Sequence, residues 1–179
     1  MLKRENTPEI ETTRLRLRKV TLQDADALLA IYQVEGIHRY RPWIPFTTIS
    51  QVKAYIKKRI YPVYQENIGY FYAIEDKLDH QVIGFISIVG IDENLCKGEI
   101  EYGLLKSYWD GGYAKEAGEA VLKKAKENGF ASVSISQSTE VPYCGKLMEL
   151  IKMRYRYSFQ MRKPGKLMIT YRYYQIDFD

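Results

Sequence analysis

The sequence predicts an α/β domain with a mixed sheet, and two kinds of pattern carry this prediction. Segments that alternate apolar and polar residues, as half-buried strands do, interchange with segments whose apolar residues recur at helical spacing. The expected order is a strand, two helices, three strands, a helix, a strand, a helix and two strands, which is typical of the α/β class. With 179 residues, 46% of them hydrophobic, the chain is expected to form one domain with its core at roughly 11–176.

The first elements have clear boundaries in the sequence. Residues 14–20 alternate leucines with arginines and predict a half-buried strand. Thr21 offers a capping oxygen for a helix that runs to about Gly36. Ser50 can cap a second helix, which Pro62 is expected to bend or end. The residues before the first strand, up to about Ile10, are expected to be frayed.

The remaining elements follow the same two patterns. Strands are expected at 69–75, 81–91, 98–104, 131–137, 153–161 and 167–176. The clearest helix is 114–128, whose buried face consists of small residues, and a short helix is expected at 144–151. Alternation along 153–161 places one set of residues on a single face of that strand: Met153, Tyr155, Tyr157, Phe159 and Met161.

Composition narrows the function only slightly. The net charge of +5 favours anionic ligands in general, but the cations are spread along the chain, which is typical of solvated surfaces. A nucleic-acid-binding module is therefore the weaker alternative, supported by charge and by 16 tyrosines. The two cysteines and two histidines are too few and too scattered for a disulfide scaffold or a zinc finger, and we expect no metal site. With no apolar export segment at the amino end, a cytoplasmic location is expected.

The most informative segment joins the strand at 98–104 to the helix at 114–128. Gly111 and Gly112 stand directly before this helix, where backbone N–H groups have no intrahelical acceptor. Such a turn, with Lys115 in the first helical turn, suits an anion such as a diphosphate. The alternative is that the two glycines form an ordinary tight turn.

Common catalytic and nucleotide motifs are absent from the sequence. It contains no Gly-x-x-x-x-Gly-Lys-Ser/Thr segment and therefore no P-loop. It also lacks Gly-x-Gly-x-x-Gly after its first strand, which excludes the dinucleotide fingerprint. Neither His38 nor His80 stands near a serine signature typical of a Ser-His-Asp triad.

The segment GEIEYGLLKSYWDGGYAKEAGEAVLKKAKENGF resembles the acyl-CoA-binding region of the GNAT N-acetyltransferases, in particular the RimJ/RimL type that acetylates ribosomal-protein N-termini. Gly112 and Ala114 match the family loop, and Trp109 stands where Gln or Arg is general. The resemblance extends over roughly Glu11 to Ile176. It implies a mixed, mostly antiparallel sheet of about seven strands with about four helices, splayed between the fourth and fifth strands.

The resemblance also implies the co-substrate. Acetyl-CoA would place its pyrophosphate on the N–H groups of the glycine turn and its pantetheine arm between the strands 98–104 and 131–137, and CoA would be the product. The residues expected to bind it are Leu104, Trp109, Asp110, Gly111, Gly112, Tyr113, Ala114 and Lys115.

Acetyl transfer to an amine requires a base for the amine and a proton for the departing thiolate. Glu99 and Glu101 share one strand face, and either is a candidate base. Cys144 and Tyr143 are the candidate acids, since Cys144 stands where the family has Ser. Val141 stands where the family has Asn, and valine has no hydrogen-bonding group.

The expected activity is acetyl transfer to a primary amine, either a protein α-amine or a small-molecule amine, by direct attack. The alternative suggested by Val141 and Cys144 is a CoA-binding relative with weak or no catalysis and a regulatory role. Arg41, Trp43 and Phe46 are the expected acceptor-binding residues. No membrane partner is expected, and a homodimer is possible through exposed aromatic strand surface.

Overall fold

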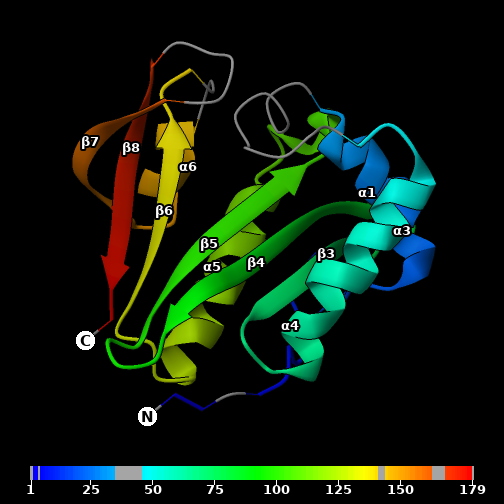
Figure 1. Cartoon of the computed structure of the whole chain (residues 1–179), viewed down its shortest axis with the longest axis horizontal. Coiled ribbons are helices and arrows are strands. Elements are labelled where there is room, and N and C mark those ends of the chain that lie inside the picture. The colour runs from blue at the N-terminus through cyan, green and yellow to red at the C-terminus, as the bar shows by residue number, and fades with distance from the viewer. Residues whose placement is uncertain (1, 4, 35–45, 141–143, 163–167, 179) are drawn as a thin grey trace.

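The computed structural model describes the chain except for residues 1, 4, 35–45, 141–143, 163–167 and 179. Its centre is one eight-stranded sheet in the order β1-β2-β3-β4-β5-β6-β8-β7 (Figure 1). Every neighbouring pair is antiparallel except β5 and β6, which are parallel. The predicted mixed α/β fold is therefore confirmed, with the two-residue β1 as an additional strand.

The elements lie close to their predicted positions. The strands are β1 (Ile10–Glu11), β2 (Leu15–Lys19), β3 (Tyr70–Asp76), β4 (Val82–Asp92), β5 (Lys97–Leu104), β6 (Ser132–Ser138), β7 (Arg154–Arg162) and β8 (Met168–Asp177). The α-helices are α1 (Ala25–Tyr32), α3 (Ile49–Tyr55), α4 (Tyr61–Gln65), α5 (Tyr113–Glu127) and α6 (Cys144–Leu150). Short 3-10 turns, η1 (Leu22–Asp24) and η3 (Lys106–Tyr108), precede α1 and α5, and a π-helical turn, η2 (Ile56–Ile60), joins α3 to α4. None of the described helices is both long and apolar enough to cross a membrane.

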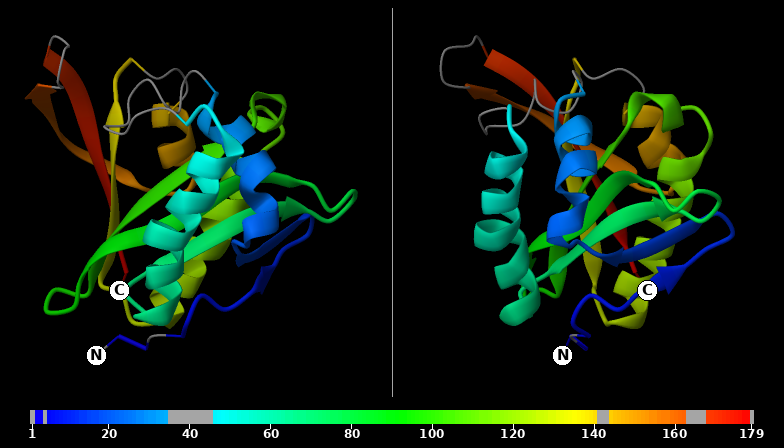
Figure 2. Two further views of the ribbon diagram at one scale, coloured as in Figure 1. Left: turned by 45° about the vertical axis from the view of Figure 1, so that its right-hand side comes forward. Right: turned by 90° about the vertical axis from the view of Figure 1, so that its right-hand side faces the viewer.

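Helices cover both faces of the sheet, and each face has its own hydrophobic cluster (Figure 2). The first cluster lies between the sheet and the pair α5 and α6, with Leu17, Tyr72 and Val121 among its buried members. The second cluster lies on the opposite face beneath α1, α3 and α4, with Leu28 and Phe85 among its buried members. Alternation along the strands supplies both clusters because successive side chains point to opposite faces.

The small-residue face of α5 lets this helix lie close to its neighbours. Ala117, Gly118 and Ala125 are buried on it. A Cβ atom on Gly118 would lie 3.3 Å from a side-chain carbon of Ile151, at the end of α6. The small side chains thus bring α5 close to the residue that follows α6, and the helix lies behind the centre of the sheet (Figure 1).

The parallel pair β5 and β6 is only partly closed. Pairing extends over three positions, from Lys97 opposite Ser132 to Glu99 opposite Ser134. Beyond Glu99 the two strands continue for several residues without pairing, and they diverge in Figure 1. The predicted splay is therefore present, between β5 and β6 once β1 is counted.

The second helix differs from the prediction at its cap, and of the two outcomes expected at Pro62, a bend or an end, the helix does not end there. Its cap is Thr48, whose hydroxyl accepts a hydrogen bond from the Gln51 N–H, rather than Ser50. The helix also continues past Pro62 to Gln65. The π-turn before Pro62 widens the helix, so that the Tyr61 N–H donates to the Ile56 carbonyl, and this widening accommodates the proline ring.

The amino-terminal residues are docked rather than frayed as predicted. Lys3 N–H donates to the Asn128 carbonyl at 2.9 Å, and Leu2 packs on the first cluster. Thr7 is buried, and Ile10 begins the edge strand β1. Apolar contacts to α5 and the sheet hold this segment, which its own sequence pattern does not indicate.

The last hairpin also departs from simple alternation. Tyr155 lies opposite Tyr174, whereas Tyr157 lies opposite the adjacent Tyr173, so a register shift separates the two pairs. Tyr155 and Tyr157 therefore face opposite sides of the sheet, and the predicted single aromatic face of this strand is wrong. β7 is an edge strand with several exposed large side chains. The homodimer suggested for this surface stays a prediction.

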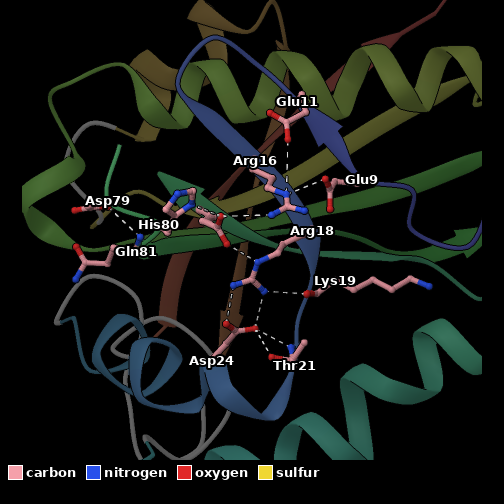
Figure 3. Close-up of polar contacts among 11 residues, drawn as sticks. Glu9, Glu11, Arg16, Arg18, Lys19, Thr21, Asp24, Asp79, His80 and Gln81 are labelled. Carbon is pink, nitrogen blue, oxygen red and sulfur yellow. Dashed lines mark hydrogen bonds and ion pairs between the residues drawn. The ribbon is translucent and has the colours of Figure 1, made fainter. Parts of the chain in front are cut away.

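A network of ion pairs fixes β2 against the start of α1 (Figure 3). Arg18 bonds through both terminal nitrogens to the buried carboxylate of Asp24, at 2.9 Å each, and through Nε to Glu75 at 2.6 Å. Burial alone would raise the pKa of both carboxyls. The hydrogen bonds from Arg18, with those from Thr21 to Asp24 and from His80 to Glu75, outweigh it and hold both pKa values below their usual range.

These lowered pKa values make part of the stability pH-dependent. The contribution is present above the ordinary carboxyl pKa, near 4, and is lost as the pH falls through the lower folded values. We expect Arg18→Met to reduce the free energy of unfolding by about 3 kcal/mol at pH 7 and by much less at pH 3. Urea denaturation at pH 7, 5 and 3 measures this difference. Arg59→Met, on the exposed side of η2, is the control, and an equal loss at all three pH values would contradict the prediction.

Candidate active site

The turn before α5 has the geometry of an anion-binding helix start. Gly112 is the N-cap residue with φ of +76°, in the left-handed region that favours glycine. A Cβ atom there would meet only an Arg14 nitrogen, at 3.6 Å, so the space above Gly112 is open. The N–H groups of Tyr113, Ala114 and Lys115 begin the helix and have no intrahelical acceptor.

Arg14 and Glu116 hold this turn against β2. Glu116 accepts hydrogen bonds from the Thr12 hydroxyl, the Arg14 N–H and the Arg14 Nε, at 2.7 to 2.8 Å. Arg14 also donates to the Gly111 carbonyl at 2.8 Å and stacks on the Tyr113 ring. The negative charge in the first turn of α5 is thus paired with a cation, and a guanidinium lies beside the turn. Both features favour a second anion at the helix start.

The other residues predicted to bind the co-substrate lie around this turn. Trp109 is partly exposed, and its indole N–H donates to the Leu104 carbonyl at 3.1 Å, which ties the loop back to the end of β5. Leu104 itself is buried in the first cluster. Asp110 is exposed, and Lys115 lies 3.8 Å from Glu119, one turn further along the helix. The structure therefore brings these residues together, while their binding roles stay predictions.

Glu99 and Glu101 share the face of β5 opposite α5, as predicted from their spacing. Glu99 is the last residue of β5 that pairs with β6, and it lines a pocket. Glu99 is an exposed residue, but protein around this pocket removes part of the water from its carboxylate. This desolvation, with the nearby charge of Glu101, raises the pKa of Glu99 above its ordinary 4.5. Its raised pKa makes the Glu99 carboxylate a stronger base than an ordinary glutamate.

The pocket has a volume of about 400 Å³ and extends over the sheet face that α5 does not cover. Its floor carries three serines of β6 in alternate positions: Ser132, Ser134 and Ser136. Its wall carries Tyr157, Phe159 and Tyr173 of the last hairpin. The Tyr157 and Tyr173 rings stack with centroids 4.8 Å apart. This combination of hydroxyls, one carboxylate and aromatic faces can hold a polar molecule with an apolar side.

Several predicted site residues lie elsewhere or outside the described residues. Arg41, Trp43 and Tyr143 are not described, and neither is the side chain of Cys144, the first residue of α6. Phe46 packs edge-on against Tyr32, with ring centroids 5.2 Å apart, and belongs to the second cluster. It is not among the residues that line the pocket, so its role with the acceptor stays a prediction.

Sequence reasoning missed the residues that complete the site. Arg14 was assigned only to the alternating strand, and its contact with Gly111 joins positions 97 residues apart. The pocket serines did carry a signal, because 132–138 reads as serines at every second position beside a strand with two carboxylates. The aromatic wall depended on the register shift in β7, which sequence alternation does not reveal.

The turn geometry makes a testable prediction for Gly112. An alanine in the left-handed region costs about 1 kcal/mol, and the open space above the residue adds no steric cost. We therefore expect Gly112→Ala to lower the free energy of unfolding by about 1 kcal/mol, and Gly112→Asn by less because asparagine tolerates this conformation. Urea denaturation of the two variants compares them, and equal losses would show that backbone strain is not the cause.

Comparison with known proteins agrees with this architecture. The sequence profile described as the acetyltransferase (GNAT) domain matches residues 14–149. The uncharacterized N-acetyltransferase YoaA of Bacillus subtilis is 30% identical over 130 residues, which cover 73% of this chain and 71% of YoaA.

Solved structures share the fold at low sequence identity. A GNAT-family acetyltransferase from Bacillus anthracis superposes with a TM-score of 0.82 at 21% identity, covering 95% of this chain and 98% of its own. RimL, the ribosomal L7/L12 α-N-protein acetyltransferase, in complex with coenzyme A, superposes with a TM-score of 0.79 at 14% identity, covering 96% and 99%. With a splayed parallel pair, a glycine turn before α5 and a matching domain profile, the chain belongs to the GNAT family of acetyltransferases.

Proposed function

We propose that this protein transfers the acetyl group of acetyl-CoA to a primary amine by direct attack of the amine. One observation carries the proposal. The desolvated carboxylate of Glu99 lies where β5 and β6 separate, on the face opposite the anion-binding turn. A base and a phosphate site on opposite sides of one gap allow donor and acceptor to approach each other from the two faces of the sheet.

The glycine turn supports binding of the donor. Acetyl-CoA supplies an activated acetyl thioester when bound. Gly112 leaves open space, the first amides of α5 are available, and Arg14 neutralises Glu116 in the first turn of the helix. These groups hold the pyrophosphate. Trp109 orders the loop that carries the turn by bonding to the Leu104 carbonyl.

Glu99 acts as the base for the acceptor. Primary amines have pKa values of about 8 to 10 and are mostly protonated at neutral pH, so a proton must leave before attack. A carboxylate with a raised pKa accepts this proton more readily, directly or through a water. Ser134 and Ser136 lie beside it on the pocket floor and can orient the acceptor by hydrogen bonds.

The acceptor is a molecule with a single amine rather than a polyamine. The residues that line the pocket include one carboxylate, Glu99, and one ammonium, Lys97. Their charges cancel, so the lining has no net negative charge that would attract a polycation. The aromatic wall suits an apolar or planar part of the molecule. Protein N-terminal α-amines and small monoamines fit this description better than polyamines do. Protonation of the thiolate by Tyr143 or Cys144 remains part of the proposal.

A second candidate is a CoA-binding relative with weak catalysis and a regulatory role. It is favoured by Val141 and Cys144, which replace residues that hydrogen-bond in the family pattern. Calorimetric titration with acetyl-CoA and a thiol-release assay over peptides, monoamines and polyamines separate the two candidates. Heat with thiol release supports the enzyme, and heat without release from any acceptor supports the regulatory relative. The absence of heat would overturn both.

The pH profile tests Glu99 as the base. We expect Glu99→Gln to lower kcat by about 10²- to 10⁴-fold with little change in the Kd of acetyl-CoA. In the unchanged protein, kcat should fall at acid pH with a midpoint above 4.5, because the carboxyl pKa is raised. Glu101→Gln removes the neighbouring negative charge, lowers the pKa of Glu99, and should therefore move this midpoint to lower pH.

Two results would contradict this assignment. One is a Glu99→Gln variant with unchanged kcat, and the other is an acid midpoint that Glu101→Gln leaves in place. Glu127→Gln, exposed near the end of α5, is the matched control for loss of a carboxylate and should leave the profile unchanged.

A further inference from the structure

A hydrogen bond crosses the gap between β5 and β6. Tyr102 and Gln137 each lie three residues beyond the last paired positions, Glu99 and Ser134, where the strands have separated. The Gln137 side-chain amide nevertheless reaches the Tyr102 hydroxyl at 3.2 Å. Two long side chains thus join strands that their backbones no longer connect.

The two residues lie on the α5 side of the sheet. Alternation along β5 places Tyr102 on the face opposite Glu99 and Glu101, and it packs against the first cluster. Alternation along β6 places Gln137 opposite the pocket serines, on the same face as the buried Ile135. The bond therefore borders the gap from the side on which the glycine turn lies, away from the acceptor pocket.

One end of the Gln137 amide is unsatisfied. Its Oε1 atom is buried and has no hydrogen-bond partner among the described residues. A buried amide oxygen without a partner costs on the order of 1–3 kcal/mol, so such groups are rare in folded proteins. The same holds if the amide is turned over, because one end then bonds Tyr102 and the other end, now NH₂, faces the same surroundings.

A residue that only packs in the core would not need this amide. Gln137 follows Ile135 on a face that otherwise carries apolar residues, where an aliphatic side chain would avoid the cost. A buried polar group that is unsatisfied in the free protein but borders a binding gap is suited to a polar ligand.

We propose that Gln137, positioned by Tyr102, binds an amide of the pantetheine arm of acetyl-CoA. This inference rests on the proposed function, since it assumes that acetyl-CoA enters the gap. The arm contains secondary amides, each with an N–H and a carbonyl, so it can satisfy the unpaired end of Gln137 in either orientation of the side chain. The phosphate and adenosine parts of the donor bind at the glycine turn and make no hydrogen bond to Gln137.

The experiment compares two ligands on the same protein by calorimetry. Acetyl-CoA contains the pantetheine arm, whereas 3′-phospho-ADP contains the adenosine, the 3′-phosphate and the 5′-diphosphate without the arm. We expect Gln137→Met, which keeps the side-chain length, to weaken acetyl-CoA binding about three- to tenfold and to leave the Kd of 3′-phospho-ADP unchanged. Gln160→Met, on the exposed edge strand β7, is the matched control and should change neither value.

Tyr102→Phe tests whether the two side chains act together. Because the tyrosine hydroxyl holds Gln137, this variant should also weaken acetyl-CoA binding, and the double variant should lose less than the sum of the two single effects. Thermal unfolding of the ligand-free protein provides a second readout. Gln137→Met should not lower Tm, because it removes an unsatisfied buried group, whereas a purely structural amide would lower it.

The outcomes separate this inference from the proposed function. If the unchanged protein binds no acetyl-CoA, the proposed function fails first. If it binds acetyl-CoA and Gln137→Met binds it equally well or more tightly, Gln137 is not a contact of the arm and this inference is overturned. An equal loss of affinity for both ligands would also overturn it, because the effect would then lie at the turn or in the fold.

Discussion

The structure depends on where the parallel pairing of two strands stops. β5 and β6 share three paired positions, and the two strands then diverge because each is held by a different neighbour. β5 is paired along most of its length with β4, and β6 along its length with β8. The gap is therefore a consequence of two well-formed antiparallel sheets that meet along a short parallel seam. The end of that seam decides which site residues border the gap: Glu99 lies at the last paired position, and Tyr102 and Gln137 lie beyond it.

Charge pairing keeps the two sides of the gap distinct. Glu116 is neutralised by Arg14 next to the glycine turn, which leaves that end of α5 favourable for an anion. On the other face, Glu99 has Glu101 as its neighbour on the strand and is desolvated by the pocket walls, which makes its charged form less favourable. One carboxylate thus fixes the helix, and the other is the proposed base. The difference arises from their partners rather than from residue type.

Much of the fold follows from local patterns in the sequence. Alternation located β2 to β8 within a few residues, and the small face and glycine stop located α5, because these signals reflect one residue's immediate neighbours. The predictions were wrong where contacts between residues far apart in the sequence determine the local structure. The cap is Thr48 rather than Ser50 because the side chains of Thr48 and Gln51 each bond the other residue's backbone N–H. The helix continues beyond Pro62 because buried residues of η2 and α4 pack in the second cluster.

The candidate site was predictable to the same extent. The glycine turn and the two strand glutamates are local features, and they lie where the sequence placed them. Arg14, the aromatic wall and the Tyr102–Gln137 bond join segments far apart in the chain, and no local pattern records such contacts. The acceptor-binding roles predicted for Arg41 and Trp43, and the role as acid predicted for Tyr143, concern residues outside the described part of the chain.

The docked amino-terminal segment has a practical consequence for how the protein is handled. It ends beside Asn128, at the carboxyl end of α5, whereas the glycine turn lies at the opposite end of this 15-residue helix, which spans about 22 Å. Chain that extends from Lys3 away from Asn128 therefore starts well away from that turn. A deletion that shortened the same segment would uncover apolar surface beneath α5 and favour aggregation.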